Sequence, residues 1–387
     1  MKKGIFVLHE GISSTIFDSQ VAEHVSHVTS RGMHMEIYSF NTVRKHWKKS
    51  KSNLSKIEKL KVLLKKGVHV YSPFSHVINF TLFFLFLYSE RNKVSFFHAR
   101  ANYSAFIVGL FCKIFSIPYV WDCRGDSVAE LKFALKNKFF LYKIYGAIFL
   151  LPIERFQIKF LCKNANAAIF VSEQLYLLYS ENLKTENFQI IPCLVNEDKF
   201  YYSELIRNDM RTKFQICDAD KVFIYSGSMV EYQGLSLQND FFSRLFVNPN
   251  NKLFYLTTDN NKAKEFLSKY PPTQYTIKSV PFEDMNSYYN MADFAILLRE
   301  NNDVNRVASP TKFGEYCMTG LQVAMNDGVE QAVEISNQLC NFVDFKDLNF
   351  VEAVSSRKLI AEKAKYYYSR SNIFYKYEDI YKNIHFN

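Results

Sequence analysis

The residues best suited to chemistry stand at the start of one expected helix, in the run Ser309-Pro310-Thr311-Lys312. Proline favours the first position of a helix, and Ser309 before it is a candidate N-cap. The backbone N–H groups and the positive dipole end at a helix start suit a phosphate. Lys312 adds a mobile cation, and Glu315, one turn on, could accept hydrogen bonds from the vicinal hydroxyls of a ribose. An ordinary capped helix with two solvated charges is the alternative, and the residues alone do not decide between the two.

Apolar runs on both sides of this helix predict buried strands. Ala295–Leu298 is a short apolar run, and Asn301–Ser309 carries too many Asn and Asp residues for a regular element. The helical spacing of apolar side chains predicts a helix over Thr311–Thr319, which Gly320 ends. Leu321–Met325 then resumes as a strand. The stretch therefore predicts a strand, a polar loop, a helix and a strand, the repeating pattern of an α/β protein.

Two further segments predict that this pattern forms two separate domains. Near the N-terminus, Gly4–Leu8 is a continuous apolar strand, Asp18–Arg31 has helical spacing and Met35–Ser39 is a second strand. This order fits the start of a doubly wound parallel sheet. Val222–Tyr225 opens a second such series in the other half of the chain. A length of 387 residues also favours two domains, each with its own core.

The run SPTKFGEYCMTGLQV, residues 309–323, resembles the donor-site helix of the family-4 glycosyltransferases. Other pieces follow in the family's order from the first strand to about Val333. The resemblance implies the GT-B fold, an α/β fold of two Rossmann-like, doubly wound domains that face each other across a cleft. It implies an acceptor domain over residues 1–199, a nucleotide-sugar donor domain over 200–370, and a C-terminal helix, 371–387, that crosses back to the first domain.

The resemblance also implies a donor site. Lys312 would stabilise the charge of the leaving nucleoside diphosphate, together with backbone groups at the helix start, and Glu315 would anchor the ribose. The turn Ser226-Gly227-Ser228, after the first strand of the second domain, would let the backbone approach a pyrophosphate. The predicted donor-binding residues are Gly227, Ser228, Gln233, Arg299, Asn305, Ser309, Pro310 and Thr311.

The chain departs from the family pattern at two places. Relatives often carry an Arg after the first Gly of that turn and a Lys before the second, where this chain has Ser228 and Gln233. Phosphate charge must then be met by Lys312, by Arg299 or Arg306, and by backbone groups. Many relatives also carry a sugar-binding Glu eight residues before the ribose-binding one, where Val307 stands here. The sequence therefore does not predict the donor sugar.

Cations at two strand ends in the first half predict an acceptor side. The run His98-Ala99-Arg100 follows a strand and resembles the family's HxR signature, whose Arg lies by the reaction centre; for His98 a place in the core is the alternative. Asp122-Cys123-Arg124-Gly125 resembles a run in capsule- and O-antigen-type members. Arg124 could hold an acceptor phosphate, or pair with Asp122 or Asp126. With Arg100 as a third catalytic residue beside Lys312 and Glu315, the predicted acceptor-binding residues are Ser13, Ser14, His98 and Arg124.

Positive charge is concentrated in the first half of the chain. Residues 1–200 carry 27 Lys and Arg against 15 Asp and Glu, and the rest carries 21 against 23. A basic amphipathic helix predicted over Leu54–Leu64, ahead of a strand at Val68–Tyr71, and a long Lys- and aromatic-rich helix over Lys132–Lys163 suit anionic lipid headgroups. The apolar run Val77–Tyr88 is too short to span a bilayer and predicts a buried helix. We expect an anionic membrane surface as a partner, with a solvated surface as the alternative, and no nucleic acid.

The expected activity follows from the resemblance. It is that of a retaining, metal-independent hexosyltransferase that needs no cofactor beyond its nucleotide-sugar co-substrate. The acceptor would be a cell-surface glycan, carried on a polyprenyl phosphate. The seven Cys residues show no metal-binding spacing and no secretory signal is evident, so we expect a cytoplasmic protein, peripheral on the inner face of the cell membrane. The alternatives are a degenerate GT-B protein that binds a nucleotide sugar or a partner without turnover, and a nucleotide-sugar epimerase.

Overall fold

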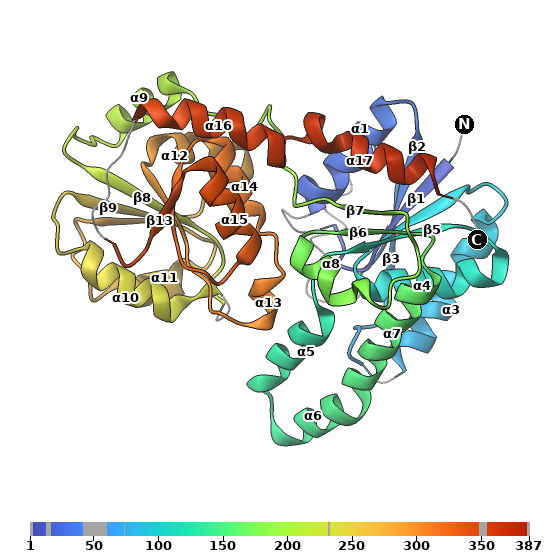
Figure 1. Ribbon diagram of the computed structural model, residues 1–387. Helices are drawn as coiled ribbons and strands as arrows, with labels where there is room; N and C mark the ends of the chain where they lie inside the picture. Colours follow the sequence, from blue (N-terminus) through green and yellow to red (C-terminus); the bar gives the residue numbers. More distant parts are fainter. Residues whose placement is uncertain are drawn as a thin grey trace. The chain divides into compact units, whose positions relative to one another are not determined.

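The chain forms two compact units in a computed structural model that describes residues 3–12, 17–41, 60–72, 74–230, 233–347 and 354–384. Unit 1 comprises Met1–Ile191 and Tyr375–Asn387, and unit 2 comprises Pro192–Phe374. In Figure 1 most of unit 1 is coloured from blue to green, and its C-terminal segment is red, like the end of unit 2. The domain boundary predicted at residue 199 lies a short way beyond this division.

Unit 1 is built on a parallel sheet of seven strands in the order β3-β2-β1-β4-β5-β6-β7. The strands are β1 (Lys3–Leu8), β2 (His34–Asn41), β3 (Val62–Lys66), β4 (Phe96–Arg100), β5 (Tyr119–Cys123), β6 (Ala167–Phe170) and β7 (Phe188–Ile190). Strands β4, β5 and β6 are buried at every residue, as expected for strands covered on both faces. The strand order reverses between β1 and β4, which makes the carboxyl ends of these two strands the expected ligand-binding edge.

Helices cover this sheet on both faces (Figure 1). They are the π-helical turn η1 (Phe17–Ala22), α1 (Glu23–Ser30), α3 (Ser75–Glu90), α4 (Asn102–Phe115), α5 (Ser127–Lys136), α6 (Phe140–Tyr145), the π-helical turn η4 (Gly146–Leu150), α7 (Leu151–Asn164) and α8 (Glu173–Ser180). The single helix predicted over Lys132–Lys163 is wrong. The chain ends α5 at Lys136, turns through Asn137, a residue that favours helix ends, and returns through α6, η4 and α7.

Other predictions for the first half are also corrected. The helix predicted over Leu54–Leu64 is wrong at Val62–Leu64, which belong to β3, and residues 54–59 lie outside the described residues. The strand predicted at Val68–Tyr71 is a loop. Pairing of β3 with β2 decides this segment, since a neighbouring strand outweighs a helical pattern of apolar residues. The predicted helix Val77–Tyr88 is confirmed as part of α3, but it is buried along one face only.

Unit 2 is built on a parallel sheet of six strands in the order β10-β9-β8-β11-β12-β13. The strands are β8 (Lys221–Ser226), β9 (Asn251–Leu256), β10 (Tyr275–Lys278), β11 (Phe294–Leu297), β12 (Gln322–Met325) and β13 (Phe342–Asp344). The helical elements are α9 (Glu204–Lys213), α10 (Leu235–Leu245), α11 (Asn260–Leu267), η6 (Phe282–Asp284), α12 (Met285–Met291), α13 (Asp303–Arg306), α14 (Thr311–Met318), α15 (Glu330–Leu339), α16 (Val354–Tyr368) and α17 (Arg370–Lys382). The strand order reverses between β8 and β11, so their carboxyl ends form the ligand-binding edge expected for this unit.

Two hydrophobic clusters fill the two faces of this sheet. One joins the sheet to α12, α14 and α16, and the other joins it to α10 and α11 (Figure 1). The loop predicted over Asn301–Ser309 contains one short helix, α13, which Asn302 caps by accepting a hydrogen bond from the Asn305 N–H. The C-terminal segment is helical as predicted, and α17 begins in unit 2 and ends in unit 1. Among the described residues, no helix is both long and apolar enough to cross a membrane.

Candidate functional site

The helix expected to carry the chemistry, α14, begins at Thr311, directly after an extended Pro310. The prediction that Ser309 caps this helix is wrong, and Pro310 stands just before the helix. The Ser309 hydroxyl accepts a hydrogen bond from the backbone N–H of Cys193 instead, at 3.2 Å. Because proline has no N–H, Thr311 and Lys312 supply the first amides of the helix. Gly320 ends the helix as predicted, with φ at +73° and too little room for a side chain beside the carbonyl of Arg357.

Lys312 and Glu315 form an ion pair one turn apart on this helix. The ammonium nitrogen of Lys312 lies 2.8 Å from Oε2 of Glu315, and the hydroxyl of Tyr289 donates to the same oxygen at 3.1 Å. The Glu315 side chain is 2 % exposed, whereas that of Lys312 is 28 % exposed. Burial, and then the neighbouring Glu315 carboxylate, raise the pKa of Tyr289, so its hydroxyl stays a proton donor. The buried carboxylate thus fixes a cation that remains accessible to a ligand.

The same helix contacts the carboxyl end of β8. The backbone N–H of Ser226, the last residue of that strand, donates to the hydroxyl of Tyr316 at 3.1 Å. The chain continues into Gly227 and then reaches Gly234, whose φ is +70°. A Cβ on Gly234 would lie 2.7 Å from the carbonyl oxygen of Leu298, so this loop packs directly on the end of β11. The start of α14 and the ends of β8 and β11 therefore meet where the strand order reverses.

The remaining predicted donor-binding residues lie around this edge and differ in their burial and in their hydrogen-bond partners. Arg299 follows β11, is 8 % exposed, and donates to the carbonyl of Leu298 at 3.1 Å. Asn305 is 3 % exposed and its amide donates to the carbonyl of Glu300 at 2.9 Å, so it holds its own loop. Ser228 and Gln233 both accept hydrogen bonds through their backbone carbonyls, at 2.9 and 3.0 Å. Among the described residues, these contacts explain how the loops at this edge are held in place. Contacts between these residues and a nucleotide-sugar donor stay a prediction.

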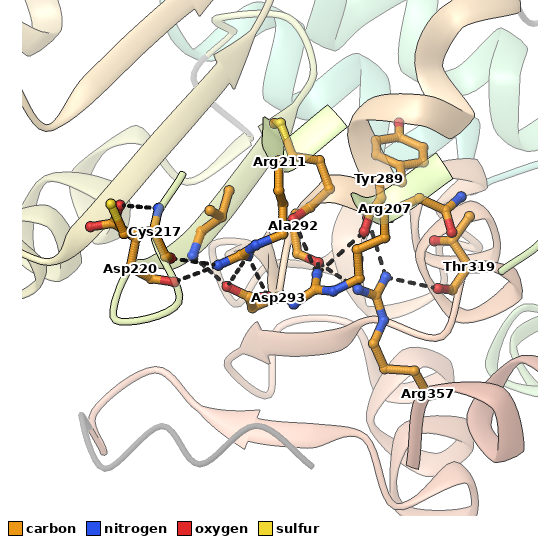
Figure 2. Close-up of polar contacts among 12 residues, drawn as sticks. Arg207, Arg211, Cys217, Asp220, Tyr289, Ala292, Asp293, Thr319 and Arg357 are labelled. Carbon is orange, nitrogen blue, oxygen red and sulfur yellow. Dashed lines mark hydrogen bonds and ion pairs between the residues drawn. The ribbon is translucent and has the colours of Figure 1, made fainter. Parts of the chain in front are cut away.

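Figure 2 shows a cluster of arginines, Arg207, Arg211 and Arg357, around Ala292 and Asp293. Arg357, 1 % exposed, donates to the carbonyl oxygens of Ala292 at 2.8 Å, Thr319 at 3.1 Å and Tyr289 at 3.3 Å. Arg207 donates to the same Ala292 carbonyl at 2.9 Å. These carbonyls belong to the C-terminal ends of α12 and α14, which leave acceptors unpaired and favour cations. The arginines thereby fix the two helices that carry Tyr289 and the Lys312–Glu315 pair.

Asp293 completes the cluster. Its carboxylate pairs with Arg207 and, at 3.2 Å, with Arg211, and it accepts a hydrogen bond from the Val222 N–H at 2.7 Å. The sequence analysis missed Arg207, Arg211 and Arg357. They belong to no motif. The only local sign of the cluster in the sequence was Ala292-Asp293, which stands directly before a strand.

In unit 1, Arg100 occupies the position predicted for it. It ends β4, is 5 % exposed, and its Nε lies 3.5 Å from Oε2 of Glu10, which follows β1. This pair sits where the strand order of unit 1 reverses. The sequence analysis did not select Glu10, although a carboxylate just after the first strand of a doubly wound sheet was a usable signal.

His98 and Arg124, both predicted to bind the acceptor, are engaged inside unit 1. His98 is fully buried, with its Nδ1 2.8 Å from the hydroxyl of Tyr381 and its Nε2 3.2 Å from Asp122. Arg124 pairs with Asp122 at 2.8 Å, one of the alternatives left open by the sequence. Burial alone would raise the pKa of Asp122, but the charge of Arg124 and the contact with His98 hold it well below its ordinary value. These contacts place His98 in the core, so we leave it out of the proposed site. Ser13 and Ser14 lie outside the described residues.

Both units are Rossmann-like, and together they define the GT-B fold. No protein-family model and no curated protein matches the chain. Among solved structures, the chain is similar to sucrose-phosphate synthase (tll1590) from Thermosynechococcus elongatus, with a TM-score of 0.69 and 13 % identity over 99 % of this chain and 98 % of that one.

Two other solved structures are similar over comparable lengths. Anabaena Alr3699/HepE in complex with UDP and glucose matches with a TM-score of 0.67 and 10 % identity, over 99 % of this chain and 100 % of that one. WaaG, a glycosyltransferase involved in lipopolysaccharide biosynthesis, matches with a TM-score of 0.63 and 16 % identity, over 94 % of each chain. Similarity at this level of identity establishes the fold, and membership of family 4 stays a prediction.

Proposed function

We propose that the protein is a glycosyltransferase that takes a sugar from a nucleotide-sugar donor bound in unit 2. The observation that carries this proposal is the Lys312 ammonium group, held by a buried Glu315 on α14, the helix whose Tyr316 contacts Ser226 at the carboxyl end of β8. A fixed cation, helix-start amides and a Gly-containing strand end together suit a diphosphate. The solved structures of HepE with UDP and with UDP-glucose make a uridine nucleotide the first ligand to test.

In this mechanism the main task of the protein is to stabilise charge as the nucleoside diphosphate leaves the sugar. As the sugar leaves, negative charge builds up on the diphosphate, and Lys312 with the first amides of α14 would neutralise it. Lys312 is already oriented by Glu315, so little reorganisation is needed at that moment. Glu315 is buried and its Oε2 is shared by two donors, so its role in this proposal is to hold Lys312, and its predicted contact with the ribose stays a prediction.

The proposal also covers the stereochemistry of the transfer and the acceptor. We propose retention of anomeric configuration without a metal ion, and a glycan acceptor carried on a polyprenyl phosphate at the membrane surface. Arg100 is the acceptor-side residue best supported by its position, because it ends β4 at the reversal of strand order. A cation there suits an acceptor phosphate.

The departures at Ser228, Gln233 and Val307 favour a second candidate, a protein that binds a nucleotide sugar without turnover. One experiment tests both. The melting temperature is measured with UDP, UDP-glucose and a panel of other nucleotides and nucleotide sugars, since a bound ligand stabilises the folded state. A shift with one base supports the donor site, and slow hydrolysis of that donor in the same sample indicates a transferase. A shift without hydrolysis or transfer favours the binding protein. No shift with any nucleotide contradicts both proposals.

A further inference from the structure

A large apolar surface on unit 1 has no role in the proposed donor site. It lies on the returning arm, α6, η4 and the first half of α7, of a helical hairpin whose other arm is α5 and which extends away from the sheet of unit 1 (Figure 1). All six residues of α6 are described and none is buried. We call this patch the hairpin surface; its exposed apolar side chains are Phe139, Phe140, Leu141, Tyr142, Ile144, Ile148, Phe149, Ile153 and Phe156.

The exposure of these side chains is unusual for residues of their size. Phe139 is 76 % exposed, Phe140 68 % and Leu141 66 %. Monomeric proteins rarely leave contiguous apolar patches of this kind in water, and such patches mark sites of interaction. The hairpin has its own small core at its base, where Leu131, Leu135 and Leu150 pack together. The exposed residues are therefore not needed to hold the hairpin to the unit.

The apolar surface continues onto a neighbouring helix. The start of α3 lies against α7, since the side chains of His76 and Gln157 approach to 2.8 Å. Just there, Phe74 and Val77 are 80 % and 65 % exposed. Aromatic and aliphatic side chains from two helices are thus presented to solvent on the same part of unit 1.

Cations are frequent along the segment that carries this surface, and acids are nearly absent from it. Residues 131–163 carry seven Lys and Arg side chains and a single carboxylate, Glu154, which is buried. The cations, all exposed, are Lys132, Lys136, Lys138, Lys143, Arg155, Lys159 and Lys163. Large aromatic side chains between flexible lysines are typical of segments that enter the headgroup region of a membrane.

We infer that the hairpin surface docks onto an anionic lipid bilayer, with its aromatic side chains in the headgroup region and its lysines against acidic lipids. A symmetric contact between two copies of the chain would bring the same cations together, and like charges repel. Anionic headgroups remove that repulsion and cover the apolar side chains. The inference builds on the membrane location proposed above, but its evidence is the surface alone, so it stands or fails independently of transferase activity.

Vesicle flotation of the full chain, without any nucleotide, tests this inference. Vesicles of phosphatidylcholine are compared with vesicles that also contain phosphatidylglycerol. We expect binding to the anionic vesicles and about 100-fold weaker binding for K136E/K138E/K143E, since each Lys near a charged membrane contributes about tenfold or less to affinity. F140S/F149S should also lose binding. Equal recovery of the wild-type chain with anionic vesicles and with none overturns the inference.

A matched control separates this surface from apolar exposure in general. Leu205 and Val247 in unit 2 are 78 % and 81 % exposed, so L205S/V247S removes as much exposed apolar character elsewhere and should bind vesicles like the wild type. The melting temperature of F140S/F149S should match that of the wild type, because both side chains are exposed. If F140S/F149S binds vesicles normally, or instead converts a wild-type dimer to a monomer in the absence of lipid, the bilayer is the wrong occupant. A Phe140→Trp variant should show a blue shift in emission with anionic vesicles only.

Discussion

Lys312 Nζ lies 2.8 Å from Oε2 of Glu315, and only the lysine of this pair is accessible to solvent. The carboxylate is fixed from behind by Tyr289, and the arginine cluster fixes the helix that carries Tyr289. The cation of the proposed donor site is thus positioned before any ligand arrives. Preorganised charge of this kind is the main contribution that a protein makes to the departure of a charged leaving group.

Loss of the Lys312 cation should lower turnover and leave the fold intact. We expect Lys312→Ala to reduce kcat by about 10²–10³, the range found when one such donor is removed. The melting temperature should fall, because the buried Glu315 carboxylate loses its cation, so rates are compared at a temperature where both proteins are folded. Initial rates with a saturating donor measure the effect, and Lys363→Ala, at an exposed position on α16, is the control. Wild-type turnover in Lys312→Ala would remove this residue from the mechanism.

Loss of Arg357 should destabilise unit 2. Its guanidinium satisfies carbonyls at the ends of two helices. Arg357→Ala leaves the carbonyls of Tyr289 and Thr319 without this donor, whereas that of Ala292 keeps Arg207. Each buried group that loses its donor costs about 1–3 kcal/mol, so we expect a loss of at least about 2 kcal/mol in the free energy of unfolding. Thermal melting followed by circular dichroism measures it. Lys358→Ala, the exposed neighbour on the same helix, should stay within about 0.5 kcal/mol of the wild type. Equal stability of the two variants would contradict this role.

The hydroxyl of Tyr381 should stabilise the attachment of the C-terminal segment to unit 1. It lies 2.8 Å from both His24 Nε2 and His98 Nδ1, and all three side chains are buried. Tyr381→Phe leaves two buried ring nitrogens without this partner and should cost about 2 kcal/mol. The control is Tyr375→Phe on the same helix, whose ring is 56 % exposed. Urea unfolding followed by Trp fluorescence compares them, since both Trp residues fall in unit 1. If Tyr381→Phe is as stable as the wild type, these contacts contribute nothing to stability.

Unit 1 should become less stable as the pH rises through neutrality. Burial raises the pKa of Glu154 from 4.5 to about 7, a hydrogen bond from Ser127 opposes this weakly, and Asp126 adds to it. The folded state therefore binds a proton that the unfolded chain releases near pH 4.5. This contribution is fully present below pH 4.5 and is lost as the pH rises through about 7, a change on the order of 3 kcal/mol.

Urea unfolding at pH 5 and pH 8 measures that change. Glu154→Gln should raise stability at pH 8 and have little effect at pH 5. Glu173→Gln, at an exposed position on α8, should behave as the wild type at both pH values. The same pH dependence in Glu154→Gln and in the wild type would show that Glu154 does not titrate near neutrality.

The sequence by itself determined the strand series and the helix that carries the site. Runs such as Gly4–Leu8 and Ala295–Leu298 are continuously apolar because strands of a covered parallel sheet are buried on both faces, and this pattern is local. The extent of α14 followed from its apolar spacing and from Gly320, whose positive φ only a glycine adopts easily. Lys312, Glu315 and Arg100 could be selected because motifs with fixed spacing contain them.

Only the tertiary structure decided which partner each polar side chain has. Ser309 resembled a cap and instead binds the Cys193 N–H, a contact 116 positions away along the chain. Residues 62–64 resembled a helix and instead pair with β2, because strand pairing depends on a distant segment. The arginine cluster had no motif either. The Lys- and aromatic-rich run over 132–163 was a visible signal for lipid headgroups, but it predicted one helix and not a hairpin. Residues that contact each other from distant parts of the sequence show no fixed spacing. The physical reason for such contacts is the burial of charge and of apolar area, which appears only once the chain has folded.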